Sequence, residues 1–244
     1  MALSGMTSAE LKAKWANEQL VALKARIRQW VKEEASDPIY EDDLKAKQLV
    51  VTLIADPPPA DIALIAGDFL CSLRSALDHL AWALVSIKGK PTRDTCFPIR
   101  HDNSVEASVA IAKATFGMPE EAITLIRHLQ PHGDGDTYKL KHLWRLHKLW
   151  NIDKHRFVTL HSTVIDWQIP IELPHPISVE KFEDHVKMRF PLSAKEKVHL
   201  YPPPFREIQF GSEEDKVLLI ARDFIEMEQY VSQGVIPMFK GFFP

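Results

Sequence analysis

Residues 60–88 read ADIALIAGDFLCSLRSALDHLAWALVSIK, and this stretch decides the fold class. Its apolar side chains recur at helical spacing and lie within about 40° of one line on a helical wheel. They are Ile62, Ile65, Phe69, Leu73, Leu80, Leu84 and Ile87. A helix with so long an apolar stripe needs partner helices to cover it. The stretch therefore predicts a helical bundle.

Four more segments combine helical periodicity with start or stop signals. They are residues 8–35, 119–129, 137–155 and 213–233, and a weaker helical pattern covers residues 104–114. Thr7 and Glu10 have the spacing of a capping box before the first segment, and Pro119 opens the second. Ser212, with Asp215 three residues later, predicts the cap of the last helix. We expect a mainly helical bundle of four to five helices.

The period of the pattern changes between residues 157 and 210, where short alternating runs are separated by proline and glycine. The runs are residues 158–166, 177–182, 186–190 and 206–210, and the β-branched run 48–54 predicts a further strand. They indicate a small antiparallel sheet inserted before the last helix. The expected fold is α+β, with one domain (1–244) made of a helical core (8–156 and 213–233) and a β-rich insert (157–210).

The composition limits the possible partners and locations. Lys and Arg total 30 against 33 Asp and Glu, a net charge of -3, so nucleic acid could bind only at a local basic patch. The two cysteines, Cys71 and Cys96, do not suit a disulfide framework or a zinc site. Residues 62–87 carry four ionisable side chains, too many for a membrane span. We expect a cytoplasmic protein with no membrane partner.

The second face of the 60–88 helix carries polar side chains together with Cys71 and Trp82. Its members are Asp68, Cys71, Arg74, Ser75, Asp78, His79 and Trp82. Arg74 and Asp78 are four residues apart and can pair along the helix. Arg74 and His79 diverge by about 140°, so they can act on one group only with help from another element or a second subunit. The face is either solvated with one ion pair, or a buried polar interface, which Cys71 and Trp82 favour.

The predicted helix 137–155 carries a basic cluster on one side, consisting of Lys141, Arg145, Lys148 and Arg156. A charge run of this kind is usually a solvated surface, and the alternative is a contact with a phosphate backbone. Asp153 points with the apolar residues toward the expected core. A buried carboxylate needs a partner, and Arg74 is one candidate.

Six of the eleven histidines lie between residues 128 and 161, so a metal site has to be considered. It could use His79, Asp153 and His155, or His142 with His147. No pair has the four-residue spacing with a nearby glutamate that a zinc helix shows, and no glycine-rich phosphate loop, nucleophile elbow or Cys-x-x-Cys pair is present. We expect no bound metal and no cofactor, and a metal-dependent hydrolase is the third hypothesis for function.

Two strings resemble a widespread set of uncharacterised bacterial proteins. Residues 67–82, GDFLCSLRSALDHLAW, contain an LR-x-ALDHL pattern, and residues 149–156, LWNIDKHR, contain an N-x-DKHR pattern. In that set the two patterns occur together. The resemblance covers about residues 48–160 and implies no activity.

The segment Arg74-Ser-Ala-Leu-Asp-His79 also resembles the signature of the HEPN superfamily of helical-bundle proteins, many of them metal-independent ribonucleases. That signature is Arg, four to six residues, then His, and Ser75 stands where Asn, Asp or His is more usual. The resemblance implies that Arg74 binds the scissile phosphate and His79 is the general acid or base, across a homodimer formed through the second helix. The early position of the motif and the β-rich insert are departures from the family.

Two main hypotheses for function follow. The first is a HEPN-like protein that binds RNA through the basic cluster and cleaves it with the catalytic residues Arg74 and His79. The second is a non-catalytic scaffold with a buried network that fixes the helix register. Its expected members are Arg74, Asp78, His79, Asn151, Asp153 and His155. The exposure and partners of His79 distinguish the two hypotheses.

Overall fold

The computed structural model has an α+β fold, which confirms the predicted fold class. It describes residues 5–33, 37–54, 56–132, 141–156, 158–164, 175–182, 185–200, 206–212, 214 and 217–243. The chain divides into two compact units: unit 1 contains residues 1–24, 60–159 and 210–244, and unit 2 contains residues 25–59 and 160–209. Residues 25–59, which the sequence places with the helical core, therefore group with most of the predicted β-rich insert.

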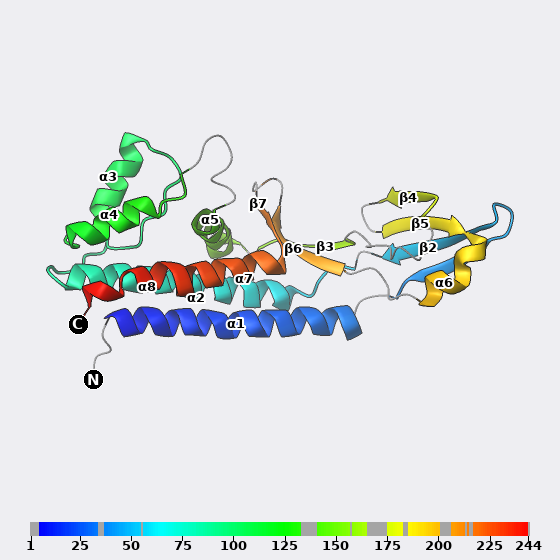
Figure 1. Ribbon diagram of the computed structural model, residues 1–244, viewed down its shortest axis with the longest axis horizontal. Coiled ribbons are helices and arrows are strands. Elements are labelled where there is room, and N and C mark those ends of the chain that lie inside the picture. Colours follow the sequence, from blue (N-terminus) through cyan, green and yellow to red (C-terminus); the bar gives the residue numbers. More distant parts are fainter. Residues whose placement is uncertain are drawn as a thin grey trace. The chain divides into compact units, whose positions relative to one another are not determined.

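Long helices form the body of unit 1 (Figure 1). The strongest sequence pattern is confirmed as α2 (Ala60–Ser86). Helix α1 (Gly5–Glu33), whose residues 5–24 belong to unit 1, lies beside α2. Helix α7 (Ala221–Gln229) continues through a π-helical turn, η3 (Tyr230–Val235), into α8 (Ile236–Met238). A short 3-10 turn, η4 (Lys240–Phe242), follows.

Three further helices lie in the described part of unit 1. They are α3 (Val105–Ala114), α4 (Glu120–His128) and α5 (His142–His155), and the first two confirm the predicted patterns at 104–114 and 119–129. The side chain of Ser104 caps α3 by accepting a hydrogen bond from the backbone N–H of Ala107 (3.0 Å). The predicted start of α5 at residue 137 lies outside the described residues.

The last helix is shorter than predicted, and the predicted cap is wrong. Ser212 ends strand β6 (Arg206–Ser212), which pairs antiparallel with β7 (Val217–Leu219). The helix begins only at Ala221, where Asp223 accepts a hydrogen bond from the backbone N–H of Ile220 (2.8 Å). Val217 and Leu219 are both buried, so their two-residue spacing marks a strand, although Val217 also fits the helical stripe that continues into α7.

Tilted aromatic rings in contact hold the hairpin against the helices of unit 1. Phe69 on α2 lies 5.4 Å from Phe224 on α7, and Phe224 lies 4.6 Å from Phe210 on β6, measured between ring centroids. All three side chains are fully buried. Aromatic rings at these separations add to the apolar burial that stabilises the fold.

Unit 2 contains a four-stranded antiparallel sheet with the order β1-β2-β5-β4. The strands are β1 (Ile39–Asp43), β2 (Gln48–Ile54), β5 (His185–Pro191) and β4 (Ser178–Lys181). Leu49 lies opposite Phe190, and Val51 lies opposite Met188. These residues form a core with Ala194 on the 3-10 turn η2 (Leu192–Ala194) and Val198 on α6 (Lys195–Leu200).

The small antiparallel sheet is thus confirmed, but its predicted position as an insert before the last helix is only partly right. Strands β1 and β2 precede α2 and supply half of the four-stranded sheet. A second sheet has the order β3-β6-β7, in which β3 spans Leu160–Val164. The simple bundle of four to five helices is also corrected, because α3, predicted only as a weaker pattern outside the bundle, and the unpredicted short α6 add to it, and the last helix is shorter.

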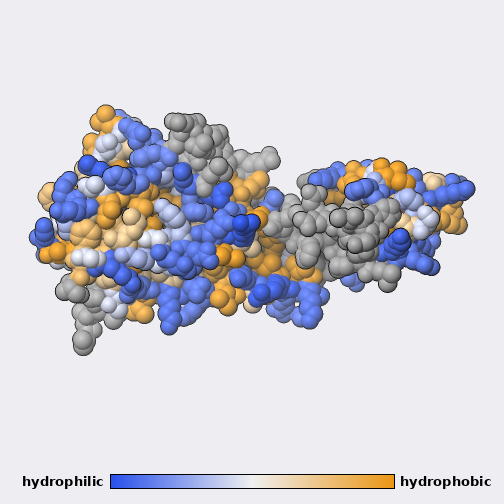
Figure 2. Space-filling model, in the orientation of Figure 1, coloured by the Kyte–Doolittle hydropathy of each residue, from blue (hydrophilic) through white to orange (hydrophobic). Residues whose placement is uncertain are grey.

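No helix in the described part of the chain is both long and apolar enough to cross a membrane. Figure 2 shows hydrophilic and hydrophobic residues interspersed over the visible face of unit 1.

Trp82 and Cys71, which the sequence suggested were buried, are exposed on α2, and Trp82 has 51% of its surface accessible.

Candidate functional site

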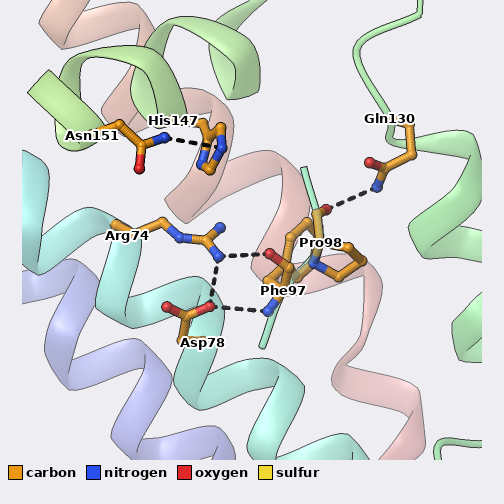
Figure 3. Close-up of polar contacts among 7 residues, drawn as sticks. All are labelled: Arg74, Asp78, Phe97, Pro98, Gln130, His147 and Asn151. Carbon is orange, nitrogen blue, oxygen red and sulfur yellow. Dashed lines mark hydrogen bonds and ion pairs between the residues drawn. The ribbon is translucent and has the colours of Figure 1, made fainter. Parts of the chain in front are cut away.

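Arg74 is buried on α2 and fastens a neighbouring segment to this helix. It is only 5% exposed. Its Nη2 donates to the backbone oxygen of Phe97 (2.7 Å) and pairs with the Asp78 carboxylate (2.9 Å), which is the pair that the spacing predicts. The same carboxylate accepts from the backbone N–H of Phe97 (2.9 Å). Arg74 and Asp78 together bind both backbone polar groups of Phe97 (Figure 3).

Helix α5 covers another side of the Arg74 guanidinium. The guanidinium carbon lies 5.5 Å from the centre of the Trp150 ring, a cation–π distance. His147, one turn earlier, accepts a hydrogen bond at Nε2 from the side-chain amide of Asn151 (3.0 Å). With Nε2 accepting, the neutral imidazole carries its proton on Nδ1. Figure 3 shows this imidazole above the guanidinium.

Burial, together with nearby positive charges, keeps the His147 imidazole neutral. Burial lowers the pKa of His147 to about 4, and the positive charges of Arg74, Arg100 and His101 act in the same direction. The pKa of Asp78 is raised, because the effect of burial exceeds the opposing effects of the Arg74 charge and the Phe97 N–H. At neutral pH the site thus contains a cation, its carboxylate partner and a neutral histidine.

His79 lies on a different side of α2 from the Arg74 site. Its Nδ1 is hydrogen-bonded to the Ser8 hydroxyl on α1 (2.6 Å), and the side chain is half-buried. Arg74 instead contacts the segment after α2 and helix α5. Within one chain the two signature residues therefore have separate partners, in agreement with the divergence expected from their five-residue spacing.

Asp153 does not pair with Arg74, so the partner suggested from the sequence is wrong. Its carboxylate lies against the backbone of α2 at Gly67, while the guanidinium of Arg74 is held by Asp78, one turn away on its own helix. Among the described residues, Asp153 has no ion pair. Burial and the negative charge of Asp68 raise its pKa.

Gly67 leaves the space that the Asp153 carboxylate occupies, and this gives a testable prediction. A Cβ atom at position 67 would lie 2.8 Å from Cγ of Asp153, which is closer than such atoms pack. We expect Gly67→Ala to lower the free energy of unfolding by about 1–2 kcal/mol in urea denaturation, through overpacking between α2 and α5.

The matched control is the same substitution in an Asp153→Ala background. Without the carboxylate, alanine should instead stabilise the helix by up to about 1 kcal/mol, because alanine favours the helix more than glycine does. A loss of stability of the same size in both backgrounds would contradict the proposed overlap.

The basic cluster of α5 does not form four free cations. Arg145 pairs with Asp223 at 2.5 Å, with both side chains largely buried, so it joins α5 to α7. Lys148 is half-buried, whereas Lys141 and Arg156 are exposed. Arg156 also has an interaction partner. Because Arg145 is largely buried in its pair with Asp223, it would not contribute to the phosphate-binding surface that the sequence predicted on this helix.

The described residues contain no group of three metal-ligating side chains close enough to hold an ion. Asp153 lies beside Gly67, and twelve residues of α-helix separate Gly67 from His79, about 18 Å along the axis. His155 is exposed at the end of α5. The combination of His79, Asp153 and His155, which the sequence offered only as a possible metal site, therefore does not converge.

The buried network overlaps only in part with the one expected from the sequence. Arg74, Asp78 and Asn151 belong to it, and the sequence analysis missed His147 and the backbone of Phe97. One face of the helix carries His147, Trp150, Asn151 and Lys154, as their spacing shows. Because His147 shares this face with Asn151, the sequence could have predicted it as a further member of the network.

The chain matches no family model, no curated protein and no solved structure. Its function is therefore inferred from the contacts within the site.

Proposed function

We propose that this chain is a non-catalytic binding protein, in which Arg74, Asp78 and His79 hold elements of unit 1 together. The observation that supports this proposal is the separate engagement of the two signature residues. Arg74 is bound by Asp78 and the Phe97 oxygen, and His79 is bound by Ser8 on another helix. Both side chains contribute to packing in the arrangement of a single chain.

The competing hypothesis, an RNA-cleaving HEPN-like dimer, requires both residues to make contacts that they do not make in the single chain. The Arg74 guanidinium would have to contact RNA phosphate although it is 5% exposed and already bound by a carboxylate and a carbonyl oxygen. It would also need the His79 of a second copy, and that histidine would have to release Ser8. The cost of separating buried charged partners disfavours such an exchange.

An RNA-cleavage assay in EDTA tests the proposal. We expect neither the wild type nor His79→Ala to cleave an end-labelled RNA of mixed sequence. His79→Ala should also lower the free energy of unfolding by about 1 kcal/mol, because the hydrogen bond to Ser8 is lost. The matched control is His155→Ala, which removes an exposed histidine and should leave stability unchanged.

Cleavage by the wild type that disappears in His79→Ala but persists in His155→Ala would overturn the non-catalytic proposal. Circular dichroism of both variants checks that they remain folded.

A further inference from the structure

A pocket of about 350 Å³ lies in unit 1 between α2, the segment 94–100, α3 and α5. Three cationic side chains border it: Arg74, Arg100 and Lys113. Asp94 is the only acid among the described residues that line the pocket, and its charge is partly offset by an ion pair with Lys113 (3.2 Å). Arg74 is likewise paired, with Asp78 on its own helix (2.9 Å), so the excess positive charge at the pocket comes mainly from Arg100.

Two residues that line this pocket, Arg74 and His147, carry polar hydrogens that lack acceptors. Nε and Nη1 of Arg74 and Nδ1 of His147 are buried and have no hydrogen-bond partner among the described residues. An arginine nitrogen can only donate, and Nδ1 of His147 also donates when Nε2 accepts from Asn151. Buried donors without acceptors are rare in native proteins, so they indicate an absent acceptor.

The charge and the donors together favour an oxyanion as the ligand. Arg100 is exposed and lines the pocket, and its guanidinium presents N–H groups in a fixed fork that matches phosphate oxygens. The donors and cations belong to α2, α3, α5 and the segment 94–100, so a tetrahedral anion could meet several of them at once. A planar carboxylate has fewer oxygen atoms to offer.

We propose that this pocket binds the phosphate group of a small phosphate monoester. The pocket is larger than a phosphate group, and its wall also contains the half-buried Ala110, which can contact a compact apolar body. The inference rests on the proposed binding role and adds the chemical class of the ligand. A single pocket of this size suits a small molecule better than a polynucleotide.

Isothermal titration of the full chain with inorganic phosphate, phenyl phosphate and benzoate tests this assignment. We expect phenyl phosphate to bind at least about tenfold more tightly than benzoate, because the phosphate makes more charge-assisted hydrogen bonds. Arg100→Gln combined with Lys113→Gln should weaken the binding of phenyl phosphate by at least about tenfold. Neither side chain belongs to the buried core, so this variant should fold.

The matched control is Lys88→Gln combined with Arg222→Gln, which removes the same charge at exposed positions outside the pocket. Its affinity should equal that of the wild type. A second readout is the NMR spectrum of the protein labelled with ¹⁵N-histidine, in which phenyl phosphate should shift the imidazole signal of His147. The signal is assigned from its absence in His147→Gln.

Three results would overturn the phosphate site: no shift of the His147 signal, equal affinity for benzoate, or equal weakening in the control variant. The proposed function is judged separately, by the RNA assay. RNA cleavage that depends on His79 would refute the non-catalytic role even if phenyl phosphate binds. An absence of both cleavage and phosphate binding would refute only the ligand class.

Discussion

Arg74→Met is expected to lower the free energy of unfolding by about 3 kcal/mol. The substitution leaves Asp78 without its cation and Phe97 without the donor to its backbone oxygen. Removing one partner of a buried ion pair is costly because the remaining charge stays poorly solvated. The Asp78 side chain is 33% exposed, which places the expected loss at the lower end of the range for such pairs. Urea denaturation measures the effect.

Arg222→Met is the matched control, because Arg222 and Glu226 form an arginine–carboxylate pair with the same four-residue spacing at the surface. Its side chain is 79% exposed, so we expect a loss below about 0.5 kcal/mol. The double variant Arg74→Met/Asp78→Asn should recover part of the loss, since it removes the unpaired charge. Equal losses for Arg74→Met and Arg222→Met would contradict the structural role of Arg74.

Local periodicity predicted the elements that carry a clear pattern of their own. Helix α2 follows directly from the spacing of its apolar residues. On that helix the five-residue separation of Arg74 and His79 predicts that their side chains diverge by about 140°, and the two residues do have different neighbours. The pattern failed at residues 217–219, where a three-residue strand and a helical stripe share the same apolar side chains. Burial in tertiary structure decides between such patterns.

The organisation of the sheets was not accessible from local patterns. Strand β2 was predicted, but its register with β5 joins Leu49 to Phe190, which are far apart in sequence. Strand β1 was missed because the segment IYEDD is short and acidic. Since β2 pairs with β5, residues before α2 group with the β-rich region, and this non-local pairing produces the division into two units.

Local sequence patterns also predicted only part of the candidate site. Helical spacing predicted the ion pair of Arg74 with Asp78, whereas the partners that complete the site come from the backbone of Phe97 and from α5. A backbone carbonyl carries no sequence signature. His147 was one of three histidines on a basic helix, and only the tertiary structure places it beside Arg74, whose charge acts on its pKa.

His147 should make the folded chain sensitive to acid. Its pKa is lowered to about 4 in the folded state, against an ordinary value of 6.5. Between these two values the unfolded chain binds a proton at His147 that the folded chain does not bind, so stability falls as the pH decreases. The contribution is complete above pH 6.5 and is lost as the pH approaches 4. We expect the loss between pH 7.5 and 4.5 to be about 2 kcal/mol.

His147→Gln isolates this contribution, because glutamine does not titrate and its carbonyl oxygen can still accept from Asn151. Asp78 and Asp153 have raised pKa values, so they oppose the effect by binding protons more readily in the folded state. Their contribution is present in both proteins and largely cancels in the difference. Urea denaturation at several pH values should therefore show a steeper loss of stability for the wild type than for His147→Gln. Parallel pH profiles would mean that the imidazole is not held neutral beside Arg74.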